Sequence, residues 1–106
     1  MTIPSPSMLH LMTCVREENP KLPELYAGKE DVLFQDIIST YRKAVKAFYD
    51  EGCRYLQFDD TSWGEFCSKE KTDAYRARGV DLEHIKRKYV EVLNEILRDK
   101  PEDLTI

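Results

Sequence analysis

Two stretches of this chain carry apolar residues at the three- and four-residue steps of an amphipathic helix. The first stripe consists of Phe34, Ile37, Ile38, Tyr41, Val45 and Phe48. The second stripe consists of Leu82, Ile85, Tyr89, Val92, Leu93 and Ile96. This spacing places each set on one face of a helix. The pattern therefore predicts helices over about 31–51 and 81–99, with Asp31 and Asp81 as their capping residues.

Three other segments favour extended backbone. The stretch 53–59 begins CRYLQF and alternates apolar and polar residues, which is typical of a strand. Pro4 and Pro6 push the residues before them out of helical geometry, which predicts a strand over about 2–9. The last residues, 103–106, have the pattern expected at the start of a further strand.

The connecting segments complete a single domain over residues 1–106. Prolines and a glycine among charged residues predict a long loop over 11–30, and the polar stretch 60–79 predicts a loop with a short helix. Alternating strands and helices indicate an α/β fold with parallel strands joined by crossovers. Three strands are too few for a complete doubly wound sheet or barrel, so we expect part of a larger fold.

The composition excludes several classes of protein. Hydrophobic residues make up 42% of the chain and charged residues 34%, as in a folded domain. The net charge of −4, without a basic cluster, argues against a nucleic-acid partner. The apolar runs are too short to cross a membrane. The three cysteines are odd in number and lack a CxxC spacing, so we expect free thiols and a cytoplasmic location.

A metal site made by this chain alone is a weak hypothesis. His10 and Cys14 lie four residues apart, but a structural zinc site needs four ligands, which usually come in two tight pairs. We therefore expect no metal held by these residues, and we interpret the thiols as inert.

The strongest candidate chemistry lies at the carboxyl end of the strand 53–59. Period-two alternation separates Gln57 and Asp59 from Leu56 and Phe58, which suit the face beneath the helices. Ligands of α/β sheets bind beyond the carboxyl ends of the strands. An ionised Asp59 at that position could bind a substrate ammonium, with Gln57 just beneath it.

Each candidate residue in this region also has an ordinary structural interpretation. Asp59 could be a simple polar end to the strand, and Asp60 could form or cap the turn that follows. Trp63 is either an anchor for the loop or a surface on which a ligand stacks. His10 is either a packed core residue or a ligand contact at the end of the first strand.

Three stretches together resemble an internal part of the cobalamin-independent methionine synthase family. They are TIPSPSMLH, FYDEGCRYLQFDDTSW and PEDLTI, and their order and spacing match over essentially all 106 residues. The similarity is greatest to single-barrel members related to the catalytic domain, and alkyl or coenzyme M transferases are related alternatives. The resemblance implies a β-α-β-α-β portion of a TIM (β/α)8 barrel, incomplete on its own.

The resemblance also implies a reaction and a set of binding residues. In the family, zinc activates the homocysteine thiol, which takes a methyl group from 5-methyltetrahydrofolate polyglutamate. By position, Asp59 matches the carboxylate that holds the amino group of homocysteine, and Asp60 stands where a Glu is common. Ser5 and Ser7 fall on a strand that borders the substrate pocket, and His10 follows that strand.

Two departures from the family pattern limit what this chain can do alone. Met12 stands where the single-barrel members have Arg, and the zinc ligands of the family lie beyond Ile106. We therefore expect part of an amino-acid pocket for homocysteine or methionine, but no zinc or folate bound by this chain alone. An alternative is a non-catalytic module that forms a homo-oligomer or pairs with a complementary fragment.

Overall fold

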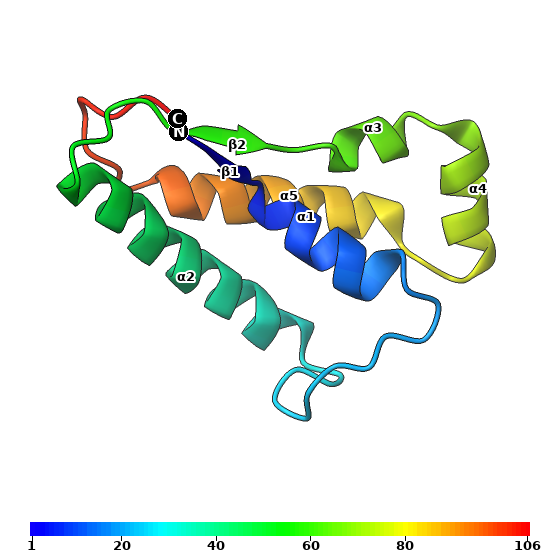
Figure 1. The fold of residues 1–106 in the computed structure, drawn as a ribbon. Coiled ribbons are helices and arrows are strands. Elements are labelled where there is room, and N and C mark those ends of the chain that lie inside the picture. The colour runs from blue at the N-terminus through cyan, green and yellow to red at the C-terminus, as the bar shows by residue number, and fades with distance from the viewer.

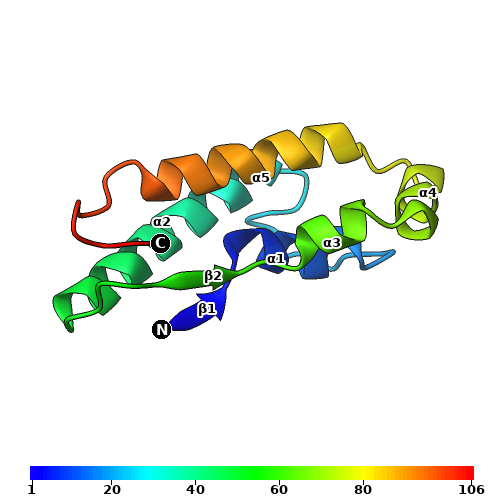
Figure 2. The same ribbon diagram turned by 90° about the horizontal axis from the view of Figure 1, so that it is seen from above.

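The computed structural model describes all 106 residues and is mainly helical. The elements in chain order are β1 (Thr2–Pro4), α1 (Pro6–His10), η1 (Leu11–Val15), α2 (Glu30–Asp50), β2 (Gln57–Asp59), α3 (Ser62–Phe66), α4 (Lys69–Ala77) and α5 (Leu82–Leu97). Figure 1 shows the long helices α2 and α5 running side by side. Figure 2 shows both helices on one side of the short sheet formed by β1 and β2.

The fold class predicted from the sequence, a β-α-β-α-β portion of a TIM barrel, is wrong for this structure. The sheet has only two parallel strands, with Ile3 opposite Phe58. The third strand expected at 103–106 is reduced to a single parallel bridge between Tyr55 and Thr105. A strand needs partners in register over several residues, and in this segment only Thr105 makes ladder hydrogen bonds.

The strand expected over residues 2–9 is also wrong beyond Pro4, because helix α1 begins two residues later. Ser5 causes the change: its Oγ accepts a hydrogen bond from the Ser7 N–H (3.1 Å) and caps the helix. Pro6 occupies the first helical position, where the helix makes no use of an N–H. The prolines thus end the strand and begin a helix.

The two long helices lie where their apolar stripes predicted them. Their observed ends differ from 31–51 and 81–99 by one or two residues. Asp81 caps α5 by accepting a hydrogen bond from the His84 N–H (3.0 Å), whereas Asp31 lies inside the first turn of α2. One buried core joins the helices to the rest of the chain. Its members are Leu11, Val15, Phe34, Ile37, Ile38, Tyr41, Val45, Leu56, Tyr75, Leu82, Ile85, Tyr89, Val92, Ile96 and Leu104.

The segments expected to be loops contain helices as well. At the start of the expected loop 11–30, α1 continues into the π-helical turn η1, which buries Leu11 and Val15. The stretch 60–79 folds into α3 and α4. Burial of these two apolar side chains stabilises the helical turn, and the polar residues after it bury no such side chains.

Glu65 anchors α3 and α4 to the rest of the molecule. Its buried carboxylate accepts hydrogen bonds from Arg16, Lys71 and Tyr75. Burial alone would raise the pKa of Glu65, but the hydrogen bonds from Arg16 and Tyr75 outweigh burial and lower the pKa. An ionised carboxylate therefore joins the segment after η1 to the two short helices.

Candidate functional site

The carboxyl ends of β1 and β2 meet at one edge of the sheet, where the sequence predicted a binding site. The Ser5 N–H donates to the Asp59 carbonyl (2.9 Å), which holds the two strand ends together. The strand expected over 53–59 is observed only as β2, Gln57–Asp59, with an isolated bridge at Tyr55 before it. In β2 Gln57 and Asp59 are exposed and Phe58 packs against the core, and Leu56 just before the strand is buried. The alternation of the strand thus directs both polar side chains to the uncovered face of the sheet.

The two adjacent carboxylates differ in their hydrogen bonds. Asp60 accepts hydrogen bonds from the Ser5 hydroxyl (2.7 Å), the Ser62 N–H (2.9 Å) and the Ser62 hydroxyl. It therefore closes the turn after β2 and ties it to the turn after β1. No side chain of this protein donates to the exposed carboxylate of Asp59. Asp59 remains available to a ligand, and Asp60 is occupied within the fold.

The two serines lie beneath this edge rather than on its surface. Ser5 and Ser7 are 0% and 1% exposed. The Ser5 hydroxyl serves both the first turn of α1 and Asp60, whereas the Ser7 Oγ is buried without a hydrogen-bond partner. Both residues support the site from inside.

Trp63 lies in the first turn of α3 and keeps about a third of its surface in solvent, at 36% exposure. Its ring packs edge-on against Phe66, with 5.5 Å between the ring centroids. This contact fits the interpretation of Trp63 as an anchor for the loop. Part of the ring is exposed, and its use as a stacking surface for a ligand stays a prediction.

His10 belongs to a different part of the molecule. Its ring stacks on Phe34 with 4.6 Å between centroids, and its Nδ1 lies 3.0 Å from the Tyr89 hydroxyl. Burial lowers the pKa of His10, a nearby Glu30 opposes the shift, and His84 adds to it. The imidazole is therefore neutral at pH 7 and is held between three helices.

The hydroxyl of Tyr89 determines which nitrogen of His10 carries the proton. Tyr89 is 1% exposed, and burial raises the pKa of its hydroxyl, which stays protonated. A buried hydroxyl hydrogen needs an acceptor, and the His10 Nδ1 is the one within reach. We assign the ring proton to Nε2, which faces Glu30.

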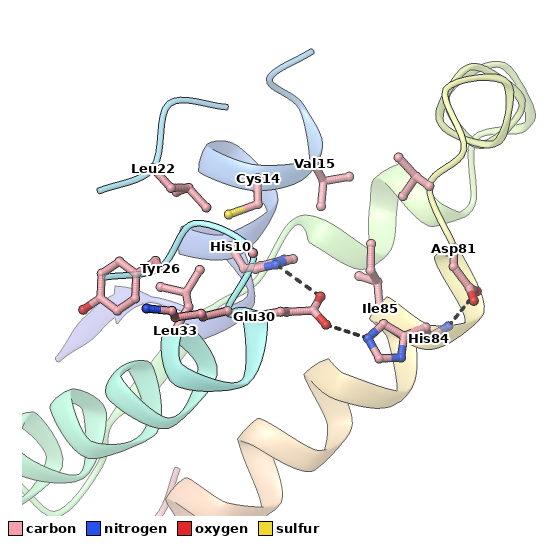
Figure 3. A pocket seen from close by; sticks show the side chains of 13 residues that line it. His10, Cys14, Val15, Leu22, Tyr26, Glu30, Leu33, Asp81, His84 and Ile85 are labelled. Carbon is pink, nitrogen blue, oxygen red and sulfur yellow. Dashed lines mark hydrogen bonds and ion pairs between the residues drawn. The ribbon is translucent and has the colours of Figure 1, made fainter. Parts of the chain in front are cut away.

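A pocket of about 390 Å³ opens beside this histidine, between the ends of η1, α2 and α5. Figure 3 shows Glu30 at its centre, between two imidazoles. The Glu30 Oε2 lies 2.8 Å from the His84 Nε2, and the Glu30 Oε1 lies 3.9 Å from the His10 Nε2. The lining residues are His10, Cys14, Val15, Leu22, Tyr26, Gly28, Lys29, Glu30, Leu33, Val80, Asp81, His84 and Ile85.

The structure thus separates the residues that the sequence grouped together. Ser5, Asp59 and Asp60 meet at the strand ends, whereas His10 lines a pocket to which none of the other expected site residues contributes. Sequence reasoning missed Glu30 and His84 as partners of His10. No spacing connects them, because they lie on three different helices.

Comparison with known proteins relates the chain to a longer protein. No protein-family model matches it. The uncharacterized proteins YxjH and YxjG of Bacillus subtilis (strain 168) are 42% and 37% identical to it over all 106 residues. A solved structure from Listeria monocytogenes, named provisionally as a vitamin-B12-independent methionine synthase, is 39% identical and superposes with a TM-score of 0.77 over 97% of this chain.

The chain resembles one segment of a methionine-synthase-like protein. It spans 26% of the length of each Bacillus relative and 28% of the Listeria structure. The similarity therefore concerns this segment, and the activity of the longer proteins is not carried over with it.

Two further observations concern metals and membranes. No group of three or more His, Cys, Asp or Glu side chains is arranged to hold a metal ion. None of the helices is both long enough and apolar enough to cross a bilayer.

Proposed function

We propose that this chain forms part of the amino-acid site of a protein related to methionine synthase, and that Asp59 binds the ammonium group of homocysteine or methionine. The observation that carries the proposal is the contrast between neighbours: Asp60 is fully engaged, whereas the Asp59 carboxylate is exposed and free at a strand end. The similarity to the Listeria structure supports the choice of substrate class.

The chemistry assigned to these residues is binding and orientation. A carboxylate and an ammonium form a charge-assisted hydrogen bond, which is about twice as strong as a neutral one. Gln57 is exposed on the same face and could hydrogen-bond the amino acid beside Asp59. In the family that the sequence resembles, zinc would supply thiol activation, and no step in this proposal depends on it.

The proposal can be tested by titrating L-methionine and N-acetyl-L-methionine against the wild-type chain and Asp59→Asn. N-acetyl-L-methionine lacks the ammonium group. The side-chain amide in Asp59→Asn lacks the negative charge that would bind an ammonium. We expect the wild type to prefer L-methionine by about tenfold or more, since a hydrogen bond to a charged group contributes about 1.5–3 kcal/mol. Asp59→Asn should bind both ligands equally weakly.

A matched control is Asp73→Asn, which removes an exposed carboxylate of α4 and should leave the preference unchanged. Equal affinity of the wild type and Asp59→Asn for L-methionine would remove Asp59 from the site. Both variants change exposed side chains, so we expect both to fold as the wild type does, and a change in affinity then reports on binding.

A further inference from the structure

The pocket around Glu30 is a second candidate site, separate from the strand ends. It is built where the last turn of α1, the start of α2 and the start of α5 converge (Figure 3). Its volume of about 390 Å³ lies within the range of about 300–1,000 Å³ that is typical of small-molecule sites. Nothing in the proposed function uses this pocket.

The central carboxylate is held in place with one oxygen left open. The His84 Nε2 contacts the Glu30 Oε2 at 2.8 Å, and the His10 Nε2–H faces the other oxygen from 3.9 Å. A separation of 3.9 Å is too long for a hydrogen bond. The His84 imidazole therefore orients Glu30, and the Glu30 Oε1 keeps the capacity to accept a hydrogen bond from a ligand.

The charges around the pocket have both signs. The N-termini of α2 and α5 each contribute about half a positive charge, which by itself would favour an anion. Glu30 and Asp81, at those same helix ends, each contribute a full negative charge, and Lys29 balances only one of them. Because these charges nearly cancel, the preference for a cation comes from the open Oε1 of Glu30, which can accept a hydrogen bond from an ammonium but not from a carboxylate.

The walls of the pocket are apolar. Leu22, Leu33, Val80 and Ile85 lie around the carboxylate. The Tyr26 hydroxyl donates to Asp36 (2.8 Å) outside the pocket, so Tyr26 offers its ring rather than its polar end. A ligand here would place a charged end on Glu30 and a hydrocarbon body against these side chains.

We propose that this pocket binds a small primary amine in its protonated form, with the ammonium on the Glu30 Oε1 and a short hydrocarbon body against the apolar wall. The contact joins opposite charges in a partly enclosed place and buries apolar surface at the same time.

The test compares three probes of similar shape: isopentylammonium, isopentyl alcohol and 4-methylpentanoate. Each is titrated at neutral pH into the ¹⁵N-labelled wild-type chain, and the backbone amide shifts are followed by NMR. We expect saturable shifts at Cys14, Glu30 and His84 with the ammonium. Binding of the alcohol should be about tenfold weaker or more, because it lacks the charge.

Three variants test whether the ammonium binds in this pocket. Glu30→Gln removes the charge and should weaken isopentylammonium by about tenfold or more. Leu22→Trp fills the pocket from a loop, leaves the carboxylate in place, and should also weaken binding. Glu24→Gln removes a nearby loop carboxylate that does not line the pocket, and it should bind as the wild type does.

Several outcomes would overturn the proposal. These are the absence of saturable shifts at the pocket amides, shifts confined to Gln57 and Asp59, equal binding of the alcohol, and tighter binding of the carboxylate. The comparison of probes uses only the wild type, so it remains decisive even where Glu30→Gln disturbs the start of α2. Unchanged affinity in Leu22→Trp would equally contradict this location.

Discussion

Asp59 and Asp60 are adjacent and identical in chemistry, but they differ in their hydrogen bonds. Asp59 is the last residue of β2 and Asp60 begins the turn after it, and only Asp60 accepts a hydrogen bond from the hydroxyl of Ser5. Asp60 joins two turns that lie 55 residues apart in the chain, and Asp59 contributes nothing to that link. Asp60 therefore contributes to the stability of the fold, whereas the Asp59 carboxylate is free for the binding role proposed above.

This division predicts different effects on stability. Asp60→Ala removes the acceptor for Ser5 and for the Ser62 N–H, so we expect the free energy of unfolding to fall by about 1–2 kcal/mol. Asp59→Ala, the matched control, should change it by less than about 0.5 kcal/mol. Urea unfolding followed by circular dichroism measures both. Equal losses in the two variants would contradict the division of roles.

The ends of three elements meet at His10, which couples the last turn of α1 to α2 and α5. Its neighbours there are the Glu30 carboxylate, the His84 imidazole and the Tyr89 hydroxyl, and Cys14 lies on the adjoining π-helical turn. The packing of these helices thus favours the neutral imidazole.

This preference makes stability depend on pH. The pKa of His10 is lowered from 6.5, mainly by burial, so the unfolded chain takes up a proton before the folded one does. The contribution of His10 to the free energy of unfolding should therefore be constant well above pH 6.5 and should fall as the pH drops below 6.5. Urea unfolding at several pH values measures the slope. His10→Gln should flatten it, and parallel curves for variant and wild type would exclude His10 as the cause.

The observed ends of the helices and strands show which sequence patterns were sufficient to predict them. The stripes of α2 and α5 identified both helices, because a 3.6-residue period is a property of the chain itself. The prolines at 4 and 6 were misinterpreted, because the same residue favours extended backbone before it and starts a helix at its own position. Capping by Ser5 decided between the two.

At the scale of the whole molecule the chain is extended rather than spherical. Its radius of gyration is 14.9 Å, against about 13 Å expected for a compact domain of this length. The sheet has helices on one side only, and Tyr55, which forms the isolated bridge with Thr105 beside the sheet, is 63% exposed. The relatives of this segment are about four times as long.

We propose that the isolated chain self-associates through this uncovered face. Sedimentation equilibrium should give a mass above 12.5 kDa that rises with concentration. Tyr55→Lys should shift the mass toward the monomer, since it places a charge on the exposed strand. Val90→Lys changes an exposed apolar residue of α5 and should leave the mass unchanged. A monomer at every concentration would contradict the proposal.

The sequence by itself determined the features that depend on neighbours along the chain. These are the two long helices and the strand that ends at Asp59, although that strand covers only Gln57–Asp59 of the expected 53–59. The tertiary structure alone decided the contacts between distant residues. The two-stranded sheet, the bond from Ser5 to Asp60, and the pocket of His10, Glu30 and His84 all join residues that no period relates. Local periodicity is set by backbone geometry, whereas these contacts exist only once packing has brought separate elements together.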